Sequence, residues 1–243
     1  LQVILAYSLF MNIYNQEKTK LVNSVFDKVY KNYDLMNDIM SFGVHRLWKK
    51  KLVNWMNPQL KNKIIDVASG TGDLAKIISK KNNDKNDICC VEPNQSMLET
   101  GAEKLKSLKN VKWYLCSAEK IPFKDNTFDF YTISYGIRNV TDINQCLKEA
   151  FRILKPGGRF FCLEFSKVEN EILDLLYQNY SKLIPLFGKI IVGSSSPYNY
   201  LINSIDKFYN QHELVSLMEK NKFSNVQFRN LSNGISAIHS GWK

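Results

Sequence analysis

The stretch Asp66-Val67-Ala68-Ser69-Gly70-Thr71-Gly72-Asp73 decides the fold of this chain. It follows the apolar pair Ile64-Ile65 and leads into residues 74–78, whose apolar side chains recur at helical spacing. This pattern predicts a strand, a tight glycine turn and a helix. Because Gly70 and Gly72 lack a Cβ and can adopt left-handed backbone angles, a ligand can lie directly against the main chain. The helix start offers that ligand free backbone N–H groups.

An acidic residue, Glu92, ends the next apolar segment, Ile88-Cys89-Cys90-Val91, twenty positions past Gly72. A carboxylate at the tip of a second strand can accept hydrogen bonds from both hydroxyls of a ribose. The glycine turn and this carboxylate together predict a site for a nucleoside cofactor. The alternative is an ordinary strand-to-helix turn that needs glycine only for its geometry.

Two nucleoside cofactors fit the turn. The spacing Gly70-x-Gly72-x-x-Ala75 satisfies the dinucleotide pattern when its last position is alanine. Asp66 and Asp73 flank the glycines, however, and two carboxylates would repel the pyrophosphate of NAD. They suit the positive sulfonium and ammonium groups of S-adenosyl-L-methionine (SAM), so charge favours SAM.

Strand and helix patterns alternate from the glycine turn to the end of the chain. Further strands are expected over 111–116, 128–134, 159–165, 226–231 and 235–239. Helices are expected over 95–106, 143–154, 169–192 and 198–221, with Asp142 as a cap. Ser232-Asn233-Gly234 joins the last two strands as a hairpin turn. These elements predict an α/β fold with a doubly wound, mostly parallel, seven-stranded Rossmann-like sheet and an antiparallel C-terminal hairpin.

Composition limits the possible partners. A chain of 243 residues with 44% hydrophobic residues suits one α/β domain with appended helices. The formal net charge of +10 would suit anionic partners, but the lysines are spread along the chain and no nucleic-acid motif accompanies them. No nucleic-acid partner is therefore expected. The charge is interpreted as general basicity of the surface, with attraction to an anionic membrane surface as a further possibility.

Cysteines and histidines show no metal pattern. The five cysteines contain no CxxC pair and are expected to be small core hydrophobes in a reducing compartment. The three histidines lie far apart in sequence and form no HExxH motif. No metal site is predicted.

Three segments resemble the UbiE family, the C-methyltransferases of ubiquinone and menaquinone biosynthesis within the class I SAM-dependent methyltransferases. They are residues 26–49, residues 129–142 with Ser134-Tyr135-Gly136-Ile137-Arg138-Asn139-Val140 at the centre, and residues 152–166. The resemblance runs from about residue 21 to 239. It implies an N-terminal extension over 1–20 and one methyltransferase domain over 21–243. Within this domain, residues 21–60 would form a helical lid and residues 169–222 a helical insertion on the substrate side.

The resemblance also implies site residues. The cofactor would be bound by Asp66, Gly70, Thr71, Gly72, Glu92, Ser117, Ala118 and Ser134. The substrate or lid set would be Tyr33, Asp34, Asn37, Tyr135 and Asn139. Two positions depart from the family pattern, because most relatives carry Asp where this chain has Glu92 and Asn where it has Ser117. Glu92 keeps the charge with a longer reach, whereas Ser117 loses an amide.

Arg138 is the candidate catalytic residue. Methylation of an aromatic carbon needs an electron-rich ring, and a cation near a ring oxygen favours the phenolate. Arg138 lies four residues past Ser134, just beyond the end of a strand. The alternative is an ion pair with a surface carboxylate such as Asp142. For His45, orientation of a ring hydroxyl and a structural role both stay open. Lys49-Lys50-Lys51 is expected to be a solvated helix face, with binding of membrane headgroups as the second choice.

The resemblance implies a SAM-dependent C-methyltransferase that acts on a polyprenyl benzoquinol of the 2-methoxy-6-polyprenyl-1,4-benzoquinol type. Alternatives are a demethylmenaquinol methyltransferase, another small-molecule methyltransferase, or a non-catalytic SAM-binding scaffold. An NAD-dependent dehydrogenase is disfavoured, because Tyr177 to Lys182 misses the Tyr-x-x-x-Lys spacing by one. Apolar residues over 172–191 supply a candidate wall for the tail, with core packing and oligomer contact as the alternatives.

Expected partners are the polyprenylated quinol, a quinone-biosynthesis complex, a second copy as a homodimer, and a membrane surface in peripheral contact. The first ten residues are apolar and could be the remnant of a presequence. This stretch and the basic charge favour the matrix side of the mitochondrial inner membrane, with the bacterial cytoplasm as the alternative.

Overall fold

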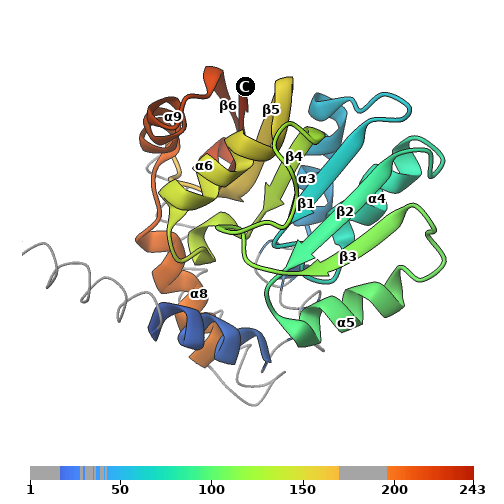
Figure 1. Cartoon of the computed structure of the whole chain (residues 1–243). Helices are drawn as coiled ribbons and strands as arrows, with labels where there is room; N and C mark the ends of the chain where they lie inside the picture. Colours follow the sequence, from blue (N-terminus) through green and yellow to red (C-terminus); the bar gives the residue numbers. More distant parts are fainter. Residues whose placement is uncertain are drawn as a thin grey trace, which may run out of the picture.

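The computed structural model describes residues 17–27, 30, 35, 37, 38, 41, 43–169 and 196–243. Its centre is a seven-stranded sheet in the order β3-β2-β1-β4-β5-β7-β6, with helices on both faces (Figure 1). Strands β1 to β5 pair in parallel, and β7 pairs antiparallel with both β5 and β6. The predicted doubly wound sheet with a C-terminal antiparallel hairpin is confirmed. The strands are β1 (Lys63–Val67), β2 (Asp87–Glu92), β3 (Val111–Leu115), β4 (Phe128–Ser134), β5 (Leu154–Phe165), β6 (Ser224–Leu231) and β7 (Ser236–Trp242).

Two apolar clusters fix the helices to the sheet. One face is covered by α3 (His45–Met56) and α4 (Asp73–Lys81), and the other by α6 (Ile143–Ile153) and α9 (Gln211–Lys220). Further described helical elements are a helix over residues 17–27, α5 (Gln95–Lys104), α8 (Ser196–Asp206) and the short turns η2 (Ile137–Asn139) and η3 (Ser232–Gly234). Within these described elements, no helix is both long and apolar enough to cross a membrane.

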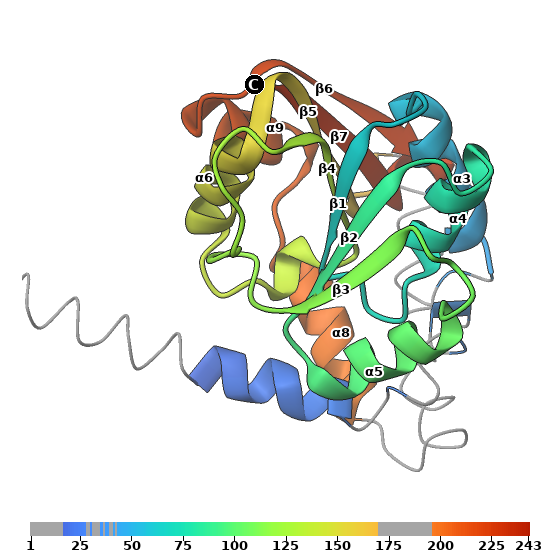
Figure 2. The same cartoon turned by 45° about the vertical axis from the view of Figure 1, so that its right-hand side comes forward.

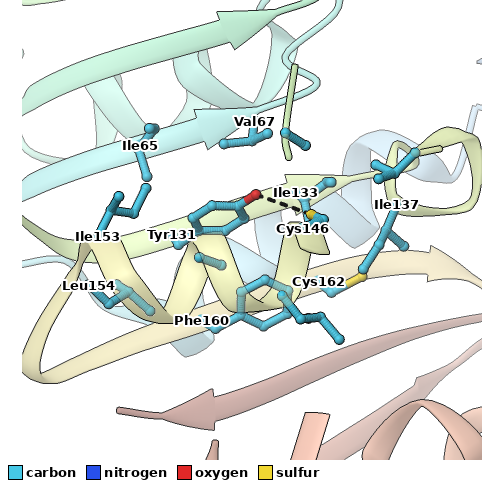
Figure 3. Packing of buried hydrophobic residues seen from close by; sticks show 14 of the residues in the cluster. Ile65, Val67, Tyr131, Ile133, Ile137, Cys146, Ile153, Leu154, Phe160 and Cys162 are labelled. Carbon is cyan, nitrogen blue, oxygen red and sulfur yellow. Dashed lines mark hydrogen bonds between the residues drawn. The ribbon is translucent and has the colours of Figure 1, made fainter. Parts of the chain in front are cut away.

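The cluster beneath α6 shows why the central strands are almost continuously apolar. Tyr131 of β4 and Phe160 of β5 stack with ring centroids 5.2 Å apart, and the Tyr131 hydroxyl lies 3.5 Å from the sulfur of Cys146 (Figure 3). Cys146 and Cys162 are fully buried there and unpaired, as expected of small core hydrophobes. A strand with helices on both faces must be apolar on both sides.

Two elements differ from the expectation. The expected helix over 198–221 is two helices, because Asn210 and Glu213 form a reciprocal capping box that starts α9 anew. Strand β5 begins at Leu154, directly after α6, so residues 155–158 belong to an irregular strand start. Asp142 does cap α6, since its side chain accepts a hydrogen bond from the backbone N–H of Gln145. The helix expected over 169–192 lies outside the described residues apart from 169.

The strand order reverses between β1 and β4, and such a switch point is where ligands bind in doubly wound sheets. The loops that follow these two strands meet at the carboxyl edge of the sheet, together with α5, α8 and the helix over residues 17–27 (Figures 1 and 2). Lys18 and Thr19 hydrogen-bond to Val140 and Thr141, just past η2. The predicted boundary at residue 20 therefore falls inside a helix that covers the switch point.

Candidate active site

The glycine turn after β1 is held in left-handed backbone conformations, with φ of 57° at Gly70 and 81° at Gly72. A Cβ added at Gly72 would lie 2.7 Å from Leu105 Cδ1 and 3.1 Å from a ring carbon of Trp113. Any side chain at position 72 would therefore clash with Leu105 and Trp113 of the protein itself, whether or not a ligand is bound. Gly72 is thus required by its backbone conformation and by packing, and it caps the N-terminus of α4.

Glu92 ties the second strand to the glycine turn. Its Oε2 accepts a hydrogen bond from the Gly70 N–H at 2.9 Å, and its Oε1 accepts one from the Asn94 N–H at 3.0 Å. Burial raises the pKa of this carboxyl to about 7, although both N–H groups favour the charged form. Each carboxylate oxygen keeps a lone pair for a further donor.

A cavity of about 440 Å³ opens beside Glu92, within the size range of small-molecule sites. It brings together six of the predicted residues, namely Gly70, Glu92, Ser117, Ala118, Tyr135 and Asn139. The helix over 17–27 adds Thr19, Val22 and Phe26 to the wall. The non-glycine Tyr135 has a φ of 57°, a strained conformation of the kind that gathers at functional sites.

A second, smaller cavity of about 20 Å³ shares Ala68 and Tyr135 with the first. It holds the predicted residues Asp66, Thr71 and Ser134. Asp66 Oδ1 accepts a hydrogen bond from the Thr132 hydroxyl at 2.8 Å. Asp66 Oδ2 and Ser134 Oγ are buried with no hydrogen-bond partner among the described residues. Burial raises the pKa of Asp66 to about 7.

The carboxylate of Asp73 is engaged by two lysines. Its Oδ1 lies 2.7 Å from Lys104 Nζ and its Oδ2 lies 3.4 Å from Lys49 Nζ. Burial would raise its pKa, but the two cations outweigh it and hold the pKa at about 2. Asp73 is therefore already neutralised, and the charge argument for SAM rests on Asp66 alone. The expected solvated face at residues 49–51 is wrong for Lys49, which is 6% exposed.

Arg138 sits in η2 with 8% of its surface exposed. Its Nη1 donates to Glu164 Oε1 at 2.6 Å and to the Tyr135 carbonyl oxygen at 2.9 Å. Arg138 does not form the ion pair with Asp142 that was the alternative, because its carboxylate partner is Glu164 on β5. Arg138 is not part of the wall of either cavity, although its neighbours Tyr135 and Asn139 are.

The N-terminal motif is described only in part. Tyr33 and Asp34 lie outside the described residues, and Asn37 is half-buried with its amide nitrogen unpartnered among them. The buried imidazole of His45 lies 2.9 Å from Asp38 Oδ1, and Asp38 also accepts from Arg46. These contacts hold the imidazole at the start of α3, while its Nδ1 is buried without a hydrogen-bond partner among the described residues, so both roles considered for His45 stay open.

Three features were missed from the sequence: Glu164, Lys49 and the helix over 17–27. Lys49 carried a readable signal, because it shares the helical spacing of the apolar Trp48 and Leu52. Glu164 lies within the family-like segment 152–166, but no local sequence pattern indicates its ion pair with Arg138. Within the part of the chain that the structure describes, no group of His, Cys, Asp and Glu side chains is placed to hold a metal ion.

The geometry defines a class of protein. A glycine turn at the switch point, a carboxylate at the tip of β2 and a nucleoside-sized cavity between them are the cofactor site of a class I SAM-dependent methyltransferase. SAM fits the residues present, since Glu92 can accept ribose hydroxyls and the unpartnered Asp66 Oδ2 suits an ammonium.

Comparison with known proteins gives the family. The model of the ubiE/COQ5 methyltransferase family matches residues 12–243, and the chain belongs to this family. A UbiE ubiquinone/menaquinone biosynthesis C-methyltransferase of Rickettsia bellii is 48% identical over 96% of this chain and 97% of its own length. One from Brucella suis is 46% identical over 96% of this chain and 89% of its own length. This protein is a SAM-dependent C-methyltransferase with SAM as its cofactor.

Solved structures agree on the fold. A SAM-dependent methyltransferase of Thermotoga maritima, described as a possible histamine N-methyltransferase, superposes with a TM-score of 0.64 at 24% identity. The match covers 90% of this chain and 99% of that one. A phosphoethanolamine N-methyltransferase of Haemonchus contortus, solved with SAM, has a TM-score of 0.59 at 12% identity and covers 81% of this chain and 52% of that one.

Replacement of Glu92 by alanine should weaken SAM binding by about 1–3 kcal/mol, because the ribose loses a charged hydrogen-bond acceptor. The rate of methyl transfer at saturating SAM should change much less. Calorimetric titration with SAM measures the loss, and the exposed Glu99→Ala on α5 is the matched control. Unchanged affinity in Glu92→Ala would remove Glu92 from the ribose site.

SAM affinity should also fall as the pH drops below about 7. The carboxyls of Asp66 and Glu92 both have pKa values of about 7, since burial favours their neutral forms. A proton on either group competes with the cofactor, so each should cost up to about tenfold in affinity per pH unit below its pKa. Titrations across this range, repeated with Asp66→Asn, should show a steep profile that becomes shallower in the variant. A flat wild-type profile would contradict this assignment.

Proposed function

We propose that this enzyme methylates a ring carbon of a polyprenylated quinol in ubiquinone and menaquinone biosynthesis. The observation that carries the proposal is the identity of 46–48% over nearly the whole chain to relatives described as C-methyltransferases of these pathways. Within that class we favour a 2-methoxy-6-polyprenyl-1,4-benzoquinol as substrate, with demethylmenaquinol as the alternative.

The proposed chemistry needs a nucleophilic ring carbon. When bound, SAM would supply an electrophilic methyl group on a sulfonium, with S-adenosylhomocysteine as the leaving group, and the methylated ring carbon would release its proton to water. Arg138 is the proposed stabiliser of the negative charge that develops on the quinol oxygen. Its Nη1 and Nε already donate to Glu164, Tyr135 and Ser204, whereas Nη2 has no partner among the described residues. That edge of the guanidinium is the one we assign to the substrate oxygen.

Neighbouring residues would place the ring. Asn139 lines the cofactor cavity and accepts a hydrogen bond from the Tyr200 hydroxyl at 3.1 Å. Tyr135 donates to or accepts from Ser236 at 3.2 Å, which fixes its ring in the wall. We propose that Tyr33, Asp34 and Asn37 close over the cofactor from the N-terminal motif.

A polyprenyl tail is membrane-soluble, so we propose peripheral contact with a membrane and a tail-binding role for residues 172–191, which lie outside the described residues. A homodimer and a quinone-biosynthesis complex are further proposed partners. The curated relatives named above are bacterial, which supports a bacterial setting over the mitochondrial inner membrane.

Methylation assays with purified protein test the function. Short-tailed 2-methoxy-6-polyprenyl-1,4-benzoquinol and short-tailed demethylmenaquinol are each incubated with SAM, and products are identified by mass spectrometry and NMR. A new methyl on a ring carbon is expected, with the first substrate preferred. Methylation on oxygen, or SAM binding without turnover of either quinol, would overturn the proposal in favour of another methyltransferase or a scaffold.

A further inference from the structure

The buried face of α3 carries a lysine. The buried side chains of α3 fall at positions 45, 48, 49, 52, 53 and 56, the spacing of one helix face. Lys49 is 6% exposed, whereas the adjacent Lys50 and Lys51 are exposed. Burial strips an ammonium of its hydration, and lysine is almost never buried without a partner. The buried ammonium of Lys49 therefore requires a polar or anionic partner.

The described part of the protein satisfies few of the hydrogen-bond donors of this ammonium. Among the described residues, Lys49 Nζ has one acceptor, Asp73 Oδ2, at 3.4 Å. Charge-assisted hydrogen bonds of this kind are normally about 2.7–2.9 Å long, and an ammonium carries three donors. Asp73 also has a second cationic partner, because its other oxygen accepts from Lys104 at 2.7 Å. The ammonium of Lys49 thus has donors left for a ligand.

The cavity beside Lys49 also lacks partners for its polar atoms. Lys49, Asp66 and Ser134 line the smaller cavity, where Asp66 Oδ2 and Ser134 Oγ are buried without a partner among the described residues. Such orphaned atoms are rare in folded proteins and each requires an explanation. The cavity has room for one small polar group and adjoins the larger cavity at Ala68 and Tyr135. A ligand with its ribose at Glu92 in the larger cavity would have to extend its amino-acid end past these shared residues to reach the smaller one.

We propose that Lys49 is a cofactor-binding residue whose ammonium binds the carboxylate of the methionyl end of SAM. A zwitterionic amino-acid group needs one anion and one cation within reach, and Asp66 and Lys49 supply both. The smaller cavity has room for only one of these two charged groups of SAM, and we assign the carboxylate to it, beside Lys49. Asp73 positions the ammonium of Lys49 at the glycine turn. This assignment depends on SAM as the cofactor and is independent of the quinol substrate.

Three ligands separate a carboxylate contact from a structural role. SAM carries the carboxylate, decarboxylated SAM lacks it, and 5′-methylthioadenosine lacks the whole amino-acid end. Their affinities are measured by calorimetry for the wild type, for Lys49→Met and for the control Lys50→Met. Methionine keeps the length and helix propensity of lysine without its charge. Because the three ligands are compared within each variant, a general loss of folded protein cannot imitate the result.

Lys49→Met should bind SAM about 10- to 100-fold more weakly, the usual range for a lost hydrogen bond between charged groups. Its affinities for decarboxylated SAM and for 5′-methylthioadenosine should stay within about twofold of the wild-type values, and Lys50→Met should match the wild type for all three ligands. Equal losses for SAM and decarboxylated SAM would assign Lys49 to the structure of the turn and overturn the proposal. Unchanged SAM affinity in Lys49→Met would overturn it as well.

Discussion

Replacing Arg138 with methionine should lower kcat by about 10²–10³-fold, the usual cost of removing an electrostatic stabiliser. The affinity for SAM should stay nearly unchanged, because Arg138 is not in the wall of either cofactor cavity. Its help is expected to be greater in the transition state than in the ground state. Single-turnover methyl transfer with a short-chain quinol analogue measures the effect.

Two further observations separate catalysis from structure at Arg138. Lysine at this position should restore only part of the rate, because it has the charge without the planar fork of donors. The deficit of Arg138→Met should shrink as pH rises, since more of the substrate is then ionised in solution. If Arg138→Met turns over at a near-normal rate, Arg138 serves only to pair with Glu164.

Replacing Glu164 with glutamine should lower the free energy of unfolding by about 3–5 kcal/mol, the cost of leaving one partner of a buried ion pair unpaired. The side chains of Arg138 and Glu164 are only 5% and 1% exposed, so water cannot replace the lost charge. Glutamine keeps the shape of glutamate and one acceptor oxygen, so the decrease in the free energy of unfolding measures the effect of the missing charge. Urea denaturation measures the change.

The two partners should differ in their effect on stability. Arg138→Met leaves a carboxyl that can become neutral by taking up a proton, and burial already raises the pKa of Glu164. Glu164→Gln leaves a guanidinium that cannot lose its proton. Arg138→Met should therefore be the milder change, and its loss of stability relative to the wild type should be smallest at low pH and grow as pH rises and Glu164 must ionise in the folded state. The double variant should recover part of the loss of Glu164→Gln, and equal stability of Glu164→Gln and the wild type would refute the argument.

Local sequence determined the strands, the turn and most helix starts. Residues 128–134 are mostly apolar and aromatic, and the structure has β4 at those residues because helices cover both sides of it. Asp142 caps α6 with its own side chain, a contact between residues three apart. The capping box at Asn210 was equally readable, but the apolar pattern continued across it and hid the break.

Tertiary structure alone decided which charges meet. Arg138 and Glu164 are 26 residues apart and pair because β4 and β5 are neighbours in the sheet. Lys49, from a run of three lysines, is buried because it falls on the covered face of α3, and with Lys104 it neutralises Asp73. Backbone preference and capping act between residues close in sequence, so the sequence pattern reveals them. Ion pairing and loss of hydration depend on which distant surfaces pack together, and only the folded chain determines that.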